Sequence, residues 1–254
     1  MNQRSRSSRR AAWQRAGLGE TMVRRLEQRE LEAFRRDGFL IVRSAFTPER
    51  VLALRSAVED LLERAAAAED AHEDGPLVPK VSWINKEKRL HNRMGDYLQP
   101  SKFDPLYIQW LAEDCYGHLS QLIDGGEEHG VRHCRFQMLC AGDDQPYKQN
   151  WHRDWQGWDP HENGGEELTF GANFKHIEWN APLMPGDQFL NVVPGSHIRR
   201  STLEERSTCI SGMQGDVDRE MPGGIKVKVE PGDVVYFDAG THTTLCRPRG
   251  CLKQ

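Results

Sequence analysis

A histidine and an aspartate stand two residues apart, at His152 and Asp154, in the stretch NWHRDWQGW, which also carries three tryptophans. On a β-strand, residues i and i+2 project to the same side, so an imidazole and a carboxylate at this spacing can bind one metal ion together. The motif alone is weak evidence. With ten histidines and seventeen aspartates in 254 residues, about 0.7 His-x-Asp pairs are expected by chance.

A second such pair, His72 and Asp74, occurs in AAAAEDAHEDGPL. We interpret this acidic stretch, up to Gly75, as a loop that cannot hold two ligands in fixed geometry. For the first pair, a histidine from a distant strand would complete two imidazoles and one carboxylate, a set typical of non-haem Fe(II) oxygen chemistry. The best candidate for that ligand is His242, which follows the strand-like VEPGDVVYFDAGT.

The elements that must position these residues change in kind along the chain. Helical patterns dominate the first half, and short alternating strands separated by Pro and Gly turns follow Gly130. This order predicts an α+β protein with a jelly-roll core and flanking N-terminal helices. In the first half we expect a helix over 24–37 ended by Gly38, a strand over 39–42, a helix begun by Thr47 and Pro48, a long loop over 84–103 and a helix opened by Asp104 and Pro105.

The length fits one large domain with an appendage. We expect a basic, disordered tail over 1–22 and a single domain over 23–254, with a helical flank over 23–128 and a jelly-roll core over 129–254. Residues 1–19 hold five arginines and no acid, which leaves about −9 on the remainder. A targeting segment and a nucleic-acid arm are the alternatives for the tail. The acidic body argues against nucleic acid as a partner.

Composition also bears on the surroundings of the protein. The six cysteines form no CxxC pair, and no run of 18 apolar residues occurs. We therefore expect reduced thiols in a cytoplasmic protein without a membrane span, acting on a small-molecule substrate. The oligomeric state stays open.

Four stretches resemble, in the same order, the phytanoyl-CoA dioxygenase-like (PhyH) family of Fe(II)/2-oxoglutarate-dependent oxygenases. They are LEAFRRDGFLIVRSAFTPERVLALRSAVEDLL, WHRDWQGW, WNAPLMPGDQFLNVVPGSHIRR and VEPGDVVYFDAG. The second is similar to the first metal motif of the branch that hydroxylates ectoine. The resemblance extends over about residues 24 to 240.

The resemblance implies a double-stranded β-helix that binds Fe(II) through His152, Asp154 and His242, with 2-oxoglutarate and O2 as co-substrates. Such an enzyme hydroxylates a C–H bond of a small molecule and releases succinate and CO2. Related halogenases lack the carboxylate ligand, so the presence of Asp154 favours hydroxylation.

Further site residues follow from the same resemblance. Gln137 matches a family position that hydrogen-bonds the co-substrate, and Trp155 and Trp158 are expected to line the substrate pocket. The far carboxylate of 2-oxoglutarate is bound in the family by an arginine on the last strand. Arg247 and Arg249 are the candidates here, although they come earlier than the family spacing and flank a proline.

The end of the chain departs from the family pattern. The distal histidine of the family usually lies one residue further along than His242, and a one-residue slip in a strand turns a side chain to the opposite face. Lys253 has better spacing for the clamp than the arginines but the wrong head group. Our hypothesis is that the coding sequence is shifted or cut near residue 241, or that the last strand is truncated.

Two other classes of protein remain as alternatives. One is a catalytically impaired family member that acts as a binding or structural protein. The other is a cupin-type metalloprotein, because PGDVVYFDAGTH also resembles the second cupin motif; cupins, however, carry His-x-His where this chain has His152 and Asp154. We interpret His161 and His176 as solvated or as residues that contact a metal ligand, and His197, in PGSH, as a turn residue that supports the site.

Overall fold

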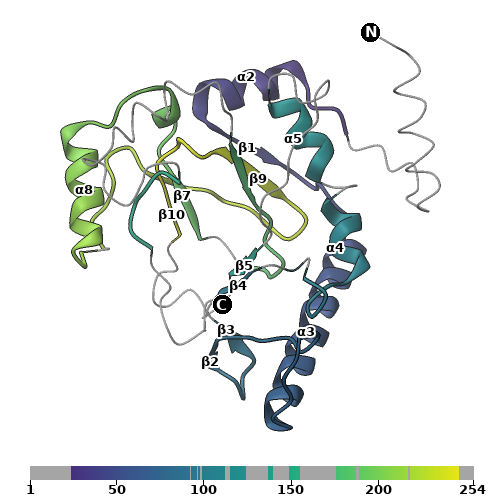
Figure 1. The fold of residues 1–254 in the computed structure, drawn as a ribbon. Coiled ribbons are helices and arrows are strands. Elements are labelled where there is room, and N and C mark those ends of the chain that lie inside the picture. The colour runs from purple at the N-terminus through teal and green to yellow at the C-terminus, as the bar shows by residue number, and fades with distance from the viewer. Residues whose placement is uncertain are drawn as a thin grey trace.

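A computed structural model describes residues 24–245 except 92, 96, 98, 112–114, 124–136, 140–148, 155–175, 187–188 and 217 (Figure 1). The basic tail expected over 1–22 lies outside the described residues. Figure 1 shows helices α2 to α5 along one side of a set of small sheets and α8 on the other side.

The first helix begins at Gln28 instead of residue 24, but the capping residues named from the sequence end this helix and begin the next one. Helix α2 (Gln28–Asp37) ends at Gly38, which has a left-handed φ of 79°, and β1 (Phe39–Val42) follows directly. Helix α3 (Pro48–Asp70) begins at Thr47, whose side chain accepts a hydrogen bond from the backbone N–H of Arg50.

The interpretation of the acidic stretch up to Gly75 as a loop is wrong over its first half, because α3 continues to Asp70. Alanine has the highest helix propensity. Three alanines of this stretch, Ala65, Ala66 and Ala68, are also buried, so packing supports the extra turns.

The first sheet has the strand order β1-β9-β6, with β9 at Val234–Asp238 and β6 at Ile177–Asn180. All neighbours are antiparallel, and Phe39 of β1 pairs with Phe237 of β9. The strand expected over 39–42, within the N-terminal flank, therefore forms an edge of this sheet.

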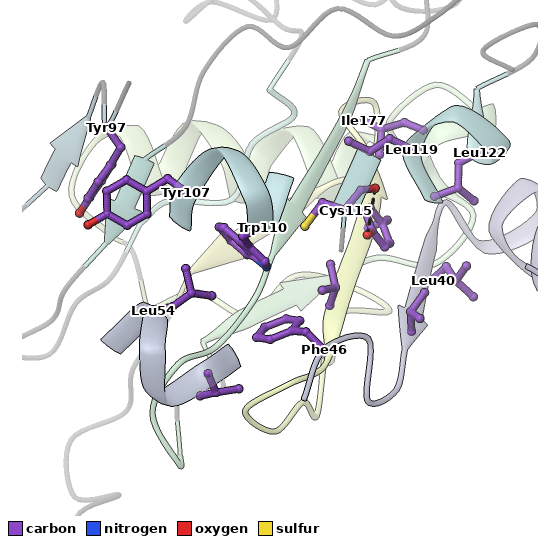
Figure 2. Close-up of a cluster of buried hydrophobic side chains, with 14 of the residues drawn as sticks. Leu40, Phe46, Leu54, Tyr97, Tyr107, Trp110, Cys115, Leu119, Leu122 and Ile177 are labelled. Atoms are coloured by element: carbon purple, nitrogen blue, oxygen red, sulfur yellow. Dashed lines mark hydrogen bonds between the residues drawn. The ribbon is translucent and has the colours of Figure 1, made fainter. Parts of the chain in front are cut away.

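Alternate residues of this sheet face two separate cores. Tyr236 and Leu40 pack with the helices, in a cluster that includes Phe46 and Trp110 (Figure 2), whose rings lie 6.0 Å apart. The residues next in sequence face the other way: Val235 and Phe237 are buried, with Phe39 and Ile41 packed beside them, against the second sheet.

The second sheet has the order β10-β7-β8, formed by Thr243–Leu245, Leu190–Val192 and Ile225–Lys226. Its buried residues Leu190 and Val192 share one core with the first sheet. Two antiparallel sheets over a common core with flanking helices agree with the expected α+β class. Much of the region after Gly130, where short strands are expected, lies outside the described residues, including 131–136, 140–148 and 155–175.

The remaining elements are short. They are β2 (Trp83–Asn85) paired with β3 (Leu90–His91), β4 (Arg93–Gly95) paired with β5 (Gln137–Leu139), α4 (Pro105–Trp110), α5 (Tyr116–Leu122), the 3-10 turn η2 (Ser196–Ile198) and α8 (Leu203–Met213). Asp104 caps α4 as expected. No helix in the described part of the chain is both long enough and apolar enough to cross a membrane.

Candidate metal centre

The structure brings His152 and Asp154 together. His152 Nε2 lies 3.4 Å from Asp154 Oδ1, and about a quarter of each side chain is exposed. Backbone hydrogen bonds hold both residues: His152 exchanges two with Thr243, and the N–H of Asp154 donates to the carbonyl of Ala239. The pair therefore has a fixed backbone and a face open to solvent.

The environment of His152 suits a metal ligand. Its Nδ1 lies 2.7 Å from the carbonyl oxygen of Asn150, which can only accept, so Nδ1–H donates there, and Nε2, on the side of Asp154, is the nitrogen that remains for a metal. Burial lowers the pKa of His152, but the Asp154 carboxylate more than offsets this and the pKa ends above its ordinary value. The negative charge of Asp154 would also stabilise a metal cation bound to Nε2.

The distance between the two donor atoms is also compatible with one cation. Donors about 2.1 Å from a metal and at right angles to each other lie about 3 Å apart. The 3.4 Å between Nε2 and Oδ1 needs only a small adjustment to reach that value. The pair thus fits two adjacent positions of a metal centre.

The second His-x-Asp pair has no such arrangement. His72 lies just beyond α3 with a left-handed φ of 53°, and Asp74 is 82% exposed and paired with Lys80. The structure agrees with the interpretation that this pair is not a metal site.

His242, expected as the third ligand, is not brought to the pair. Its ring is buried, with Nε2 2.8 Å from Ser201 Oγ and 3.2 Å from Arg153 Nε, and with Nδ1 3.9 Å from Cys209 Sγ. Within the described ranges, no three His, Cys, Asp or Glu side chains lie close enough to hold a metal together. The expected set of His152, Asp154 and His242 is therefore not formed, and the alternation of side chains along β10 is the reason.

Behind the pair lies a polar cluster that the sequence analysis missed. Arg153 is 1% exposed and donates to the carbonyl oxygens of Ser196 and Arg199 and to Ser201 Oγ. Burial and then the Arg153 guanidinium lower the pKa of His242 to about 3, so its imidazole is neutral. The signal was available, because a residue between two ligands on one strand must point to the other side.

A second histidine–carboxylate pair lies on the facing sheet. Glu178 of β6 pairs with Phe237, so it faces the inter-sheet side, and it contributes to the raised pKa of His152. His176 Nε2 lies 3.7 Å from Glu178 Oε1, and a third of each side chain is exposed. His176 is thus partly buried and lies beside a carboxylate.

His197 lies in a turn, as expected, and contacts the end of α2. It lies in η2, and its Nε2 is 3.1 Å from the carbonyl oxygen of Arg35 at the end of α2. The PGSH turn is thereby tied to the helical flank.

Five expected site residues are not placed. Trp155, Trp158, Arg247 and Arg249 lie outside the described residues, and of Gln137 the structure describes the backbone, in β5 opposite Gly95. The roles expected for these residues stay predictions.

Solved structures with the same fold were found by comparison. HygX from Streptomyces hygroscopicus, solved with iron bound, has a TM-score of 0.57 and 17% identity over 91% of this chain and 83% of its own. AviO1 from Streptomyces viridochromogenes Tue57 has a TM-score of 0.56 and 20% identity over 89% and 90%. SnoK, a non-haem α-ketoglutarate-dependent carbocyclase from nogalamycin biosynthesis, has a TM-score of 0.53 and 19% identity over 91% and 81%.

These structures share their fold with this chain. The chain belongs to the phytanoyl-CoA dioxygenase (PhyH) family, whose model matches residues 34–242. No curated protein sequence matches it.

Proposed function

We propose that this chain is an Fe(II)/2-oxoglutarate-dependent oxygenase that hydroxylates a C–H bond of a small molecule and releases succinate and CO2. The observation that carries the proposal is the His152–Asp154 pair, with Nε2 aimed at a carboxylate oxygen 3.4 Å away. Membership of the PhyH family supports it, as do HygX structures solved with iron and with nickel and 2-oxoglutarate. Because SnoK is a carbocyclase, the structural neighbours do not single out hydroxylation. The support for hydroxylation is Asp154, the carboxylate that related halogenases lack.

The roles of the described residues follow from their contacts. Fe(II) with 2-oxoglutarate supplies O2 activation when bound, and His152 and Asp154 would hold the metal. The Asn150 carbonyl sets the tautomer and orientation of the imidazole. Val192 is fully buried and pairs with Thr243, so the segment bridged to His152 packs on apolar core on its β7 side.

The proposal also includes roles for the expected site residues whose side chains the structure does not describe. Gln137, Arg247 and Arg249 are proposed to bind 2-oxoglutarate, and Trp155 and Trp158 to line the substrate pocket. Their support is the family resemblance.

Anaerobic titration of the purified chain with Fe(II) and 2-oxoglutarate tests the proposal through the visible metal-to-ligand charge-transfer band. The band is expected in the wild type and lost in His152→Ala and Asp154→Ala. The matched controls are His72→Ala and Asp74→Ala, which remove the same residue types at the same spacing and should keep the band. A folded wild type without the band, or a band that survives His152→Ala, contradicts the proposal.

One observation favours a second candidate, the catalytically impaired family member. The third expected ligand, His242, is engaged by Arg153 and Ser201 instead of facing the pair. Such a protein would be folded but poor in metal. Succinate formation from 2-oxoglutarate in the presence of Fe(II) and O2 separates the two, since the impaired protein forms none.

A further inference from the structure

We propose that Thr243, not His242, stands at the third protein position of the metal centre, so that the cation is held by one imidazole and one carboxylate beside a neutral hydroxyl. His242 is then a structural residue that anchors Arg153. This inference rests on the proposed function, because it concerns the same site.

The pairing of the strands places Thr243 on the metal side. His152 and Thr243 form an antiparallel bridge and exchange backbone hydrogen bonds of 3.0 and 2.8 Å. Directly opposed residues of an antiparallel pair project to the same face with Cβ atoms about 5 Å apart. On its other edge Thr243 pairs with Val192, which lies in the core between the two sheets. One row, Val192, Thr243 and His152, therefore faces the interior.

A separate set of contacts places His242 on the outer face. The N–H of Val193 donates to the carbonyl of His242, and Val193 is buried with Trp151, Cys209 and Met221 in a cluster of its own. Cys209 comes from α8 (Figure 1), and its Sγ lies 3.9 Å from His242 Nδ1. His242 thus belongs to a second row that packs under α8, away from the inter-sheet core.

A slip of β10 by one residue would carry His242 to the interior but would break this arrangement. It would remove the paired hydrogen bonds between His152 and Thr243 and turn Thr243 outward. The Nε–H of the buried Arg153 would also lose its acceptor, which is the Nε2 atom of His242. The Ser196 hydroxyl, 2.9 Å from the N–H of His242, holds the same register.

A centre of this kind should bind its metal weakly, and a substitution at residue 243 should strengthen the binding. A threonine hydroxyl is a poor substitute for imidazole as a ligand for Fe(II) or Mn(II). Supplying an imidazole at residue 243 should complete the set of two histidines and one carboxylate. Because even an outer partner of a ligand changes metal affinity by roughly 10- to 100-fold, we expect Thr243→His to tighten binding by at least about 10-fold.

The test is Mn(II) binding to the full chain, followed by the electron paramagnetic resonance signal of the free ion, with folding checked by thermal melting. We expect Thr243→His to lower the Kd for Mn(II) by at least about 10-fold relative to the wild type. Thr243→Val, which keeps the shape and removes the hydroxyl, serves as the matched control and should not tighten binding. His242→Gln should leave the Kd unchanged within about twofold while it lowers the melting temperature, as expected for a residue outside the ligand set.

Several results would overturn the inference. One is a folded His242→Gln that loses Mn(II) as completely as His152→Ala, which would make His242 the ligand and leave the proposed function standing. Loss of Mn(II) in Glu178→Gln would assign the third position to the facing sheet. If His242→Gln does not fold, an unchanged Kd in Thr243→His is sufficient to reject the inference.

The same data separate the inference from the proposed function. Tight binding by Thr243→His with none by the wild type upholds the placement of residue 243 and contradicts a native oxygenase centre. No binding by either protein rejects both.

Discussion

Arg153 and His242 meet on the outer face of the second sheet, where the Arg153 Nε–H donates to His242 Nε2 across 3.2 Å. The same guanidinium donates to the carbonyl oxygens of Ser196 and Gly240, so one side chain joins three segments that are far apart in the sequence. The two metal-binding candidates on either side of Arg153 are positioned by this buried anchor.

Arg153→Leu should lower the free energy of unfolding by about 3–5 kcal/mol, because several buried carbonyls and the His242 ring lose their donor. Arg153→Lys should recover little of this, since an ammonium cannot reproduce the donor geometry of a guanidinium. Urea denaturation measures both. The control is Arg29→Gln, an arginine that is 81% exposed and paired with Glu27, which should match the wild type. An Arg153→Leu protein as stable as the wild type would refute the anchoring role.

Glu205→Gln should destabilise the protein at pH 7 by about 1–3 kcal/mol. The Glu205 carboxylate is 2% exposed, binds Arg199 at 2.6 and 2.8 Å and accepts from the N–H of Thr202 at 2.7 Å. Burial raises its pKa, but the Arg199 contacts and the backbone hydrogen bond outweigh burial and bring the pKa to about 2. The stabilisation is therefore complete above the ordinary glutamate pKa and lost as the pH falls toward 2.

The difference between Glu205→Gln and wild type, measured by urea denaturation, should accordingly shrink between pH 4.5 and pH 2.5. Its exposed neighbour Glu204 is the control, and Glu204→Gln should change stability little at any pH. A difference for Glu205→Gln that does not depend on pH would show that the charge of the carboxylate is not what stabilises the fold.

His91 should make the stability depend on pH in mildly acidic solution. The ring is 1% exposed, and burial lowers its pKa to about 4. Between that value and the ordinary pKa near 6.5 the unfolded chain binds a proton that the folded chain does not, so stability rises with pH by about 1.4 kcal/mol per unit for this group. His91→Phe should reduce the slope of unfolding free energy against pH by about that amount between pH 4.5 and 6, whereas the exposed His72→Phe should not. An unchanged slope in His91→Phe would count against a buried neutral ring.

Gly38→Ala and Gly186→Ala separate two costs of adding a methyl group. Both glycines have left-handed backbones, with φ of 79° and 84°, so each alanine should cost about 1 kcal/mol in backbone strain. A Cβ at Gly38 would also lie 2.4 Å from His197 Nδ1 and 2.6 Å from Thr241 Oγ1, while one at Gly186 has no atom within 4 Å. Thermal or urea unfolding should show Gly38→Ala less stable than Gly186→Ala by a further 1–3 kcal/mol, roughly. If both variants lose the same free energy of unfolding, the PGSH turn moves aside for the added methyl group without destabilising the fold.

Local signals in the sequence were sufficient for much of the architecture. Thr47 and Pro48 begin α3, and Gly38 ends α2, because caps depend on a few adjacent residues. The metal candidates His152 and Asp154 were also found from the sequence, because their spacing allows a shared face and the neighbouring family-like stretches distinguish them from His72 and Asp74.

The partners of those residues depended on the tertiary structure. The pairing of β1 with β9 joins residues about 200 positions apart, and no local pattern specifies it. His242 was chosen as the histidine nearest to the family position, which lies one residue further along, and the register of β10 against His152 places that ring outward and Thr243 inward. A strand alternates with a period of two, so a single residue of register decides which side chain reaches the metal, and register is set by long-range pairing and packing.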